Sequence, residues 1–507
     1  MNARPLKYLS EPELRFAFDQ TAEDPRDGLT LYGPLDIARP YGVRAGVIGT
    51  ERGVELYRRW VRWAQRPVGR NPTDASRPMF PGFSAAFRTA WEVDPVATIV
   101  LTDREIDERL EVSDPHQRVF GVVSLYSDRL LAARREDESR PDLWFVVVPD
   151  RLKTHCRPLS KAPANSAKQT NVSFRNAQSA RQFKRNQSLF QELDKEADVY
   201  LHEIDFHNQL KARLLRDQVI TQGVKESTLG NILALPNDEY SGGSIAIQPE
   251  IAWRLSTAVF YKCGGRPWKL ADVRPGVCYV GIVFKRDETH ADPRWACCAA
   301  QMFLDSGDGM VFKGALGPWH SPETLQNHLS YLAAKEIAAS VANEYRRGGG
   351  ILKELYLHGR ASFNGEEMNG FRDGAGSDVE VVGVTIKKDS TLKLFRAVGN
   401  TPLMRGSYYQ ADERNVYLWT KGFVPRLRRY PGWEVPNGLK VSVRSDRVPI
   451  DRTMSDVLML TKLNYNACGF ADGVPVTLKF ADAVGEILTA APFGNQPPPP
   501  LPFRHYV

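Results

Sequence analysis

The chain has 507 residues, of which 42% are hydrophobic and 25% are charged, and a formal net charge of +7 at pH 7. This length exceeds what one compact core usually serves, so we expect two or more domains of an ordinary globular protein. The mild positive charge permits a nucleic acid as partner without requiring one. The sequence shows neither an apolar signal segment nor a run approaching about 18 apolar residues, so we expect a cytoplasmic protein without membrane contact.

The six cysteines are scattered along the chain and form no Cys-x-x-Cys pair. Several of them lie in apolar runs, as Cys278 does, which is typical of buried free thiols in a reducing compartment. The cysteine spacing therefore gives no support for a zinc site.

The first half of the chain predicts an alternation of strands and helices after about 140 residues of short apolar runs and turn signals. Residues 143–149, LWFVVVP, predict a strand at the centre of a sheet that is buried on both faces. The polar, basic stretch 160–188 predicts a flexible loop or an insertion that a partner orders. A helix is expected over about 249–262, because the pair Gly264-Gly265 is a good helix stop.

Prolines and glycines near 270–276 indicate a domain boundary, and the order of elements beyond it differs. Three successive strands are predicted there, the last two joined by a tight turn, over 277–286, 295–305 and 309–315. Then follow a helix from Ser321-Pro322 to about Arg347, a strand at 352–359, a short helix and a strand at 379–387. Three antiparallel strands followed by helix, strand, helix and strand is the order of the ribonuclease H fold.

A candidate binding site begins on the predicted helix 206–215, whose apolar residues recur at helical spacing. His207 and Lys211 are four residues apart and therefore share one face of that helix. Like charges at this spacing repel each other, so the pair suits a shared anion better than it suits a bare helix. Gln222 follows shortly after the helix. Lys262 lies just before the pair Gly264-Gly265, from which one cysteine separates it.

In this order, His207, Lys211, Gln222 and Lys262 resemble the 5′-phosphate pocket in the MID domain of Argonaute proteins. The C-terminal half resembles a PIWI domain, and the whole chain is similar to a short prokaryotic Argonaute, which lacks the N-terminal and PAZ domains. The resemblance implies an α/β fold, with a Rossmann-like MID domain followed by a ribonuclease-H-like PIWI domain. It divides the chain into an N-terminal segment packed with MID, the MID domain and the PIWI domain, at 1–140, 141–270 and 271–507.

The residues of this pocket have the chemistry that a terminal phosphate requires. A phosphate carries close to two negative charges and three acceptor oxygens, which two lysines, a directional amide and an imidazole can satisfy. For any one of these residues alone, a solvated helix-face lysine or a loop glutamine is the better explanation, so the ordered set carries the hypothesis. Many Argonautes have a further lysine where this chain has Ala258, so we expect another basic group to contribute.

The resemblance also implies a magnesium ion in the pocket. In Argonautes that lack one pocket lysine, Mg²⁺ often joins the guide phosphates to the C-terminal carboxylate, here that of Val507, with the glutamine, here Gln222, nearby. Phe503, Tyr506 and Val507 are apolar or aromatic, which predicts a tail packed into the protein. The alternative is a tail that only fills the core between the two domains.

The carboxylates of a slicing Argonaute are not found where the resemblance places them. Two Mg²⁺ ions need a cluster of acidic ligands, whereas Val283 or a neighbouring apolar residue, and Gly359, stand at two of the positions. Asp482 is a candidate for the fourth position, and one carboxylate cannot hold two metals. The triplet Arg-Asp-Gly within 371–374 is interpreted as a turn in a loop. We therefore expect no catalytic residue and no enzymatic activity.

Three further features have competing interpretations. Residues 404–407 and 462–466 resemble PIWI segments that approach the nucleic-acid backbone, and ordinary surface residues explain them equally well. His358, at a strand end, is expected to be a structural histidine rather than a general base.

The resemblance implies a catalytically inactive protein that holds a 5′-phosphorylated small guide RNA and recognises a complementary single-stranded DNA target. Its output is then expected from a separately encoded effector that contains an APAZ domain, with a TIR, sirtuin-like or nuclease activity, in prokaryotic defence against plasmids or phage. Two alternatives stay open: an active ribonuclease-H-type guided nuclease whose carboxylates lie elsewhere, and an Argonaute-like scaffold that no longer binds nucleic acid.

Overall fold

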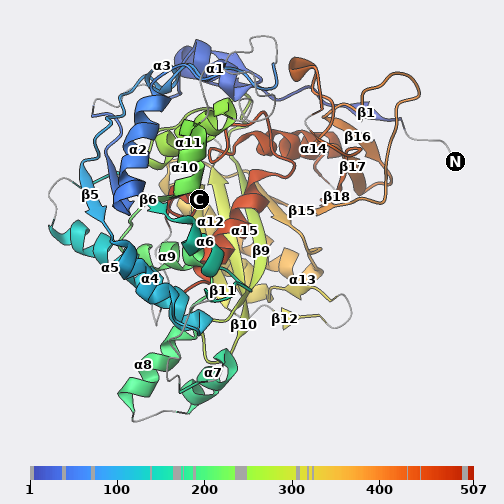
Figure 1. Ribbon diagram of the computed structural model, residues 1–507. Helices are drawn as coiled ribbons and strands as arrows, with labels where there is room; N and C mark the ends of the chain where they lie inside the picture. Colours follow the sequence, from blue (N-terminus) through green and yellow to red (C-terminus); the bar gives the residue numbers. More distant parts are fainter. Residues whose placement is uncertain are drawn as a thin grey trace.

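The computed structural model describes residues 5–507 except for the ranges 37–40, 70–74, 137–139, 164–172, 187–189, 235–247, 304–308, 317–318, 322–324 and 494–500 and the single positions 175, 431 and 446. Two sheets, with helices on both faces of each, form the body of the molecule (Figure 1). Among the helices in the described ranges, none is long and apolar enough to cross a membrane.

The first domain is built on a four-stranded parallel sheet with the order β5-β4-β6-β7. Its central strand β6, Leu143–Val148, is buried at every position, which confirms the strand expected from LWFVVVP. The other strands are β4 (Ala45–Gly49), β5 (Ala97–Val100) and β7 (Thr221–Lys225). Because β4 and β5 precede residue 141, the sheet joins the segment 1–140 and the segment 141–270 into one unit.

Helices cover both faces of this sheet. Alternate residues of β6 belong to two separate hydrophobic clusters, one on each face. One face packs against α2 (Glu51–Ala64), α10 (Glu226–Ala234) and α11 (Gln248–Lys262). The other packs against α4 (Asp103–Leu110), α5 (Pro115–Glu136), α6 (Asp150–His155) and α9 (Phe206–Leu214). A parallel sheet between two helical layers is the Rossmann-like arrangement.

The second domain contains a nine-stranded sheet with the order β1-β16-β17-β18-β15-β14-β9-β10-β11. Three antiparallel strands open it, as expected: β9 (Val277–Asp287), β10 (Arg294–Phe303) and β11 (Gly309–Leu316). Then β14 (Glu354–Gly359) and β15 (Glu380–Lys388) add in parallel to β9, which is the ribonuclease H order. The remaining strands are β1 (Lys7–Tyr8), β16 (Ser407–Gln410), β17 (Asn415–Leu418) and β18 (Leu439–Arg444).

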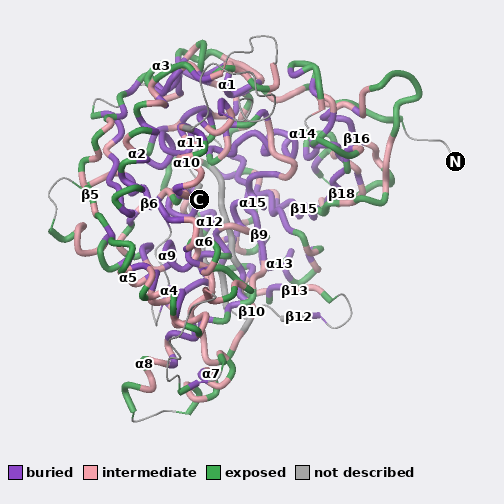
Figure 2. The backbone as a smooth tube through the Cα atoms, viewed as in Figure 1, coloured by how far each residue is buried: buried purple, intermediate pink, exposed green. Residues whose placement is uncertain are grey.

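A hydrophobic layer lies on each face of this second sheet, whose central strands are mainly buried (Figure 2). Helices α12 (Tyr331–Arg347) and α13 (Gly365–Ala375) cover one face. The other face packs against α15 (Val476–Leu488) and α14 (Ile450–Met459), in one cluster with α2 and α11 of the first domain. The first domain therefore lies on the α15 side of the second sheet.

The helix expected from Ser321 begins at Tyr331, so this prediction is wrong at its start. The hydroxyl of Ser330 accepts a hydrogen bond from the backbone N–H of Ala333 and so caps the helix. The chain before it pairs as two short strands, β12 (Trp319–His320) and β13 (Asn327–His328). Pro322 and most of the turn expected at 305–309 lie outside the described residues.

The Arg-Asp-Gly triplet lies inside helix α13, which corrects its interpretation as a turn. Asn364 and Glu367 cap the start of this helix reciprocally, and the helix then continues through the triplet to Ala375. Two of its glycines are needed for packing: a Cβ on Gly370 would lie 2.3 Å from the backbone oxygen of Tyr331, and one on Gly374 would lie 2.2 Å from that of Lys335. Helices α12 and α13 therefore approach each other closely.

The basic stretch 160–188 contains a helix, α7 (Ala177–Arg185), which contradicts a wholly irregular loop. Asn176 caps it, and it packs against α8 (Gln191–Val199) at the lower edge of the view in Figure 1. Arg181 and Arg185 form ion pairs of 2.9 and 2.7 Å with Glu288 and Asp292 in the connection between β9 and β10. The rest of the stretch lies in large part outside the described residues.

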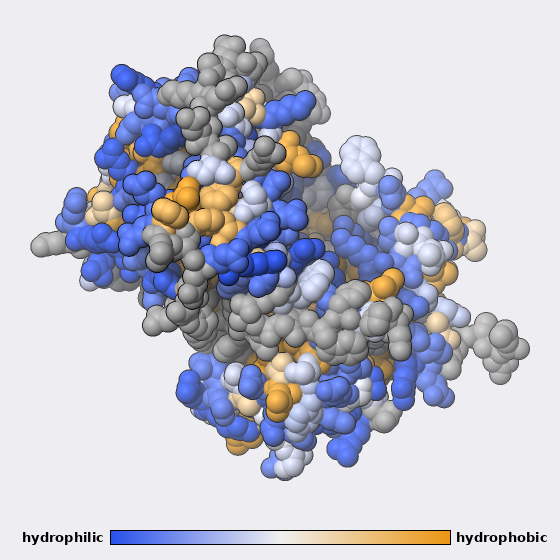
Figure 3. Space-filling model, turned by 90° about the horizontal axis from the view of Figure 1, so that it is seen from below, coloured by the Kyte–Doolittle hydropathy of each residue, from blue (hydrophilic) through white to orange (hydrophobic). Residues whose placement is uncertain are grey.

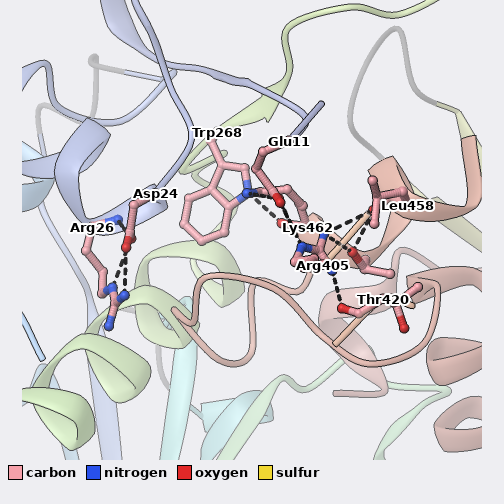
Figure 4. A network of polar contacts seen from close by, with 9 residues as sticks. Glu11, Asp24, Arg26, Trp268, Arg405, Thr420, Leu458 and Lys462 are labelled. Carbon is pink, nitrogen blue, oxygen red and sulfur yellow. Dashed lines mark hydrogen bonds and ion pairs between the residues drawn. The ribbon is translucent and has the colours of Figure 1, made fainter. Parts of the chain in front are cut away.

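A buried ion network fixes the N-terminal segment to the second domain (Figure 4). Glu11 accepts hydrogen bonds from Arg405 Nε at 2.9 Å and from Lys462 Nζ at 2.8 Å, and all three side chains are at most 10% exposed. Burial alone would raise the pKa of Glu11, but the two cations lower it overall. Arg405 and Lys462 are therefore buried structural groups, which excludes the surface position considered for them.

We expect Glu11→Ala to lower the free energy of unfolding by about 3–5 kcal/mol, because it leaves two buried cations without their anion. Denaturation in urea measures this change. Asp451→Asn is the matched control, since it removes an exposed ion pair (3.0 Å to Lys7) that also joins the N-terminal segment to the second domain. Equal transition midpoints for the two variants would contradict the role assigned to Glu11.

Candidate guide-phosphate pocket

Helix α9 presents two polar groups toward the space between α9 and β7. Asp205 caps the helix by accepting a hydrogen bond from the N–H of Asn208, and Phe206, Leu210 and Leu214 are buried in the core. His207 is exposed, and its ring lies beside β7, where a Cβ on Gly223 would be 3.9 Å from His207 Cδ2. Lys211, one turn further, is buried.

The second pair of predicted residues meets at the end of α11. The ammonium group of Lys262 donates hydrogen bonds to Gln222 Oε1 at 2.7 Å and to the backbone oxygen of Thr221 at 3.1 Å. The helix stops here because Gly264 has a φ of +90°, a conformation that favours glycine. Strand β7 and helix α11 thus bring together Gln222 and Lys262, which are forty residues apart along the chain.

A cavity of about 490 Å³ opens between these elements. His207, Gln222 and Ala258 line it, whereas Lys211 and Lys262 lie behind its wall, where both are 3% exposed. Four more basic side chains that we did not select from the sequence also line it, beside apolar residues: Lys153, Arg157, Lys225 and Arg254. Arg254 lies one helical turn before Ala258, so it is a basic group of the kind expected to replace the missing lysine.

Burial lowers the pKa of the two lysines behind the wall. Desolvation lowers the pKa of Lys211 to about 7. Burial, followed by the charge of Lys211, lowers the pKa of Lys262 well below its ordinary value. An anion in the cavity would reverse these shifts, because it stabilises the charged form of each group.

The C-terminal residues reach this region, as the apolar tail predicts. Phe503, Tyr506 and Val507 are at most 8% exposed and belong to the main hydrophobic cluster. The Lys211 ammonium donates a hydrogen bond of 2.5 Å to the backbone oxygen of Val507. The tail therefore fills the core and also contacts helix α9.

The two oxygens expected to hold Mg²⁺ are each hydrogen-bonded to a buried lysine. Gln222 Oε1 and the Val507 oxygen are hard donors of the kind that Mg²⁺ prefers. Each of them accepts a hydrogen bond from a buried ammonium group, Lys262 and Lys211 respectively. A Mg²⁺ ion beside these two lysines would need the negative charge of a bound phosphate.

The three positions examined for a nuclease centre do not converge. Gly359 pairs with Ile282 of β9, so it lies on the α12 and α13 face, where a Cβ would be 2.9 Å from Phe363. Val283 belongs to the cluster on the opposite, α15 face. The alternation of side chains along a strand thus separates the two positions, and this corrects their assignment to one site.

Asp482 of α15 is neutralised by cations rather than grouped with other carboxylates. It accepts a hydrogen bond from Arg360, the residue after β14, and lies 3.6 Å from the Lys285 ammonium. Within the described ranges, no three or more His, Cys, Asp and Glu side chains are grouped so that they could hold a metal ion. The five cysteines whose surroundings are described are buried thiols outside any disulfide bond, as expected.

His358 of β14 is a buried structural residue. Its Nδ1 is 2.9 Å from Thr477 Oγ1, and burial lowers the pKa of the ring to about 3. A neutral imidazole that is fully enclosed has no access to a substrate proton. This geometry agrees with the structural role expected for His358.

Comparisons with known proteins identify the fold. No family model and no curated protein sequence matches the chain. Among solved structures, the Clostridium butyricum Argonaute bound to a guide DNA and a 19-mer target DNA is similar, with a TM-score of 0.63 and 13% identity over 97% of this chain. An A. aeolicus Argonaute gives a TM-score of 0.52 and 14% identity over 99% of this chain, and Drosophila Piwi gives 0.52 and 12% over 96%.

The chain spans about half the length of these structures, 53–55% of each. The matched part contains the Rossmann-like first domain and the ribonuclease-H-like second domain, in the order expected for MID and PIWI. The likeness covers nearly all of this chain, so it describes both domains together. The chain therefore has an Argonaute-like fold.

Proposed function

We propose that this chain is a catalytically inactive short Argonaute that holds a 5′-phosphorylated small guide RNA and recognises a complementary single-stranded DNA. The observation that carries the proposal is the cavity of about 490 Å³, which His207 and Gln222 line and behind which Lys211 and Lys262 are buried. Helix α9, strand β7 and helix α11 contribute these four residues to one basic pocket, as the Argonaute resemblance implies for the guide phosphate.

The pocket would bind the terminal phosphate by charge and by directed hydrogen bonds. In this proposal Gln222 donates its amide N–H to a phosphate oxygen, while Lys211 and Lys262 supply positive charge. The exposed ring of His207 would stack on the first base or donate a hydrogen bond. Arg157, Lys153, Lys225 and Arg254 would hold the phosphates that follow. A Mg²⁺ ion held by the Gln222 and Val507 oxygens would add positive charge between phosphates and oxygen ligands.

The proposal assigns the output to a second protein. The ion pairs of Asp482 with Arg360 and Lys285 support a second domain without nuclease activity. Recognition of a target would then activate an APAZ-containing effector with TIR, sirtuin-like or nuclease activity, in defence against plasmids or phage. The described residues on the face seen from below are mostly hydrophilic, which suits contact with polar partners (Figure 3).

A binding experiment tests the guided recognition. The purified chain is loaded with a 5′-phosphorylated RNA guide and offered a complementary or a scrambled single-stranded DNA. We expect at least tenfold tighter retention of the complementary strand, and equal retention of both strands would overturn the proposal. The effector is tested by adding a candidate APAZ partner and measuring its activity, which should appear only when guide and matching target are both present.

Guide affinity is expected to decrease as the pH rises above about 7. Lys211 has a pKa of about 7, and a bound phosphate favours its charged form, so binding takes up a proton at higher pH. Below pH 7 the group is already charged and no proton is needed. One proton taken up corresponds to about a tenfold loss of affinity per pH unit.

Filter binding of 5′-phosphorylated guide at pH 6.5, 7.5 and 8.5 measures this slope. The same guide with a 5′-hydroxyl is the control, since it lacks the group that Lys211 faces. An affinity ratio between the two guides that stays constant over this range would show that Lys211 does not titrate on binding.

A further inference from the structure

An arginine-rich cavity of about 810 Å³ lies at the C-terminal end of α13, apart from the pocket described above. The end of α13, the start of β15 and the end of β18 form its walls. Five cationic side chains line it: Lys335, Arg372, Arg414, Arg444 and Arg447. Two carboxylates, Asp373 and Glu380, also line it, so positive charge is in excess.

The second sheet separates this cavity from the guide-phosphate pocket. Val381 lines the cavity and is buried in the cluster of α12 and α13. Its neighbour Val382 is buried in the opposite cluster, which contains α15 and the first domain. The cavity therefore opens on the sheet face that the first domain does not cover.

The packing of α13 on α12 brings the cationic groups together. Gly374 allows close contact with the backbone of Lys335, so Arg372 on α13 and Lys335 on α12 lie on one wall. The triplet Arg372-Asp373-Gly374 thus provides one cation and one carboxylate of this cavity, together with the glycine that allows the two helices to pack.

Both carboxylates of the wall are held by hydrogen bonds. Asp373 Oδ2 accepts a hydrogen bond of 2.5 Å from the Tyr331 hydroxyl. Glu380 accepts one of 3.0 Å from Ser445 Oγ and one of 3.4 Å from Arg447 Nη1. These carboxylates keep acceptor capacity for a ligand that brings its own hydrogen-bond donors.

The lining restricts the class of ligand. Pockets for small organic cofactors are mostly apolar, whereas this lining is mostly polar. Arginine forks match carboxylate and phosphate groups. A DNA backbone offers acceptors only, whereas an acidic peptide offers carboxylates for the arginines together with backbone N–H donors for Asp373 and Glu380. We propose that this cavity binds an acidic segment of a protein partner.

A labelled octa-glutamate peptide tests the proposal by fluorescence anisotropy at low and moderate salt. Arg372→Gln with Arg447→Gln removes two exposed cations of the cavity. Arg104→Gln with Arg347→Gln is the matched control, because both of these side chains are exposed, lie outside the cavity and remove the same charge. Thermal unfolding checks that all variants are folded.

We expect the cavity variant to bind the peptide at least tenfold more weakly than the wild type, and the control variant to bind it as the wild type does. Equal losses in both variants, or no measurable binding by the wild type, would overturn the proposal. A 5′-hydroxyl single-stranded DNA is offered in parallel. If the cavity substitutions weaken its binding more than that of the peptide, the cavity is a phosphodiester site and the proposal is wrong.

Discussion

The double variant Lys211→Ala with Gln222→Ala is expected to bind a 5′-phosphorylated guide RNA about 10²- to 10⁴-fold more weakly than the wild type. Each charge-assisted hydrogen bond to the phosphate contributes roughly 1.5–3 kcal/mol, and the variant removes two of them. Lys211 and Gln222 belong to different elements, α9 and β7, so the loss reports on the pocket rather than on one helix.

Two controls isolate the phosphate from the fold in this experiment. A 5′-hydroxyl guide should be bound almost equally by the wild type and the variant, because it lacks the terminal phosphate. The variant Gln191→Ala with Lys195→Ala changes the same residue types on α8, where both side chains are exposed and outside the pocket. If the preference for 5′-phosphate over 5′-hydroxyl is the same in the wild type and the pocket variant, Lys211 and Gln222 do not hold the phosphate.

The purified chain is expected to leave a guide-matched target uncut in the presence of Mg²⁺ or Mn²⁺. In-line hydrolysis of a phosphodiester needs two metal ions on clustered carboxylates, whereas Asp482 pairs with Arg360 and Lys285. Introducing Val283→Asp with Gly359→Asp should not restore cutting. The two positions face opposite sides of the sheet, and a Cβ at 359 would already lie 2.9 Å from Phe363.

Denaturing electrophoresis of an end-labelled target, with a slicing Argonaute as positive control, measures this activity. A metal-dependent cut at one fixed phosphodiester, seen only with a matching guide, would show that the second domain is a nuclease. Cleavage that is independent of the guide would indicate a contaminating enzyme and should disappear on further purification.

Local signals in the sequence were sufficient for the central elements of both domains. The uninterrupted apolar run of β6 and the Gly-Gly stop after α11 are properties of adjacent residues, and both elements lie where they were expected. The start of α12 was missed because Ser-Pro is a weaker local signal than the hydroxyl cap that Ser330 provides. The pairing of β1 with β16, about 400 residues apart, depends on tertiary structure and has no local signal.

The candidate site was predicted only in part, for a similar reason. His207 and Lys211 share a helix face, so their spacing of four residues indicates their proximity. Lys153, Arg157 and Lys225 come from other segments, which the parallel pairing of β6 with β7 brings to the cavity. Val283 and Gly359 were assigned to one site without their register, which a single sequence does not give. The pairing of β9 with β14 places them on opposite faces.

The 5′ ends of the nucleic acid that co-purifies with the chain test the central claim most directly. Bound RNA is extracted from the wild type and from the Lys211→Ala, Gln222→Ala variant, and is labelled with polynucleotide kinase before and after phosphatase treatment. The account predicts short RNAs from the wild type that are labelled only after phosphatase treatment, and a large loss of these RNAs in the variant. Wild-type protein free of nucleic acid, or RNA with free 5′-hydroxyl ends retained equally by both proteins, would contradict it.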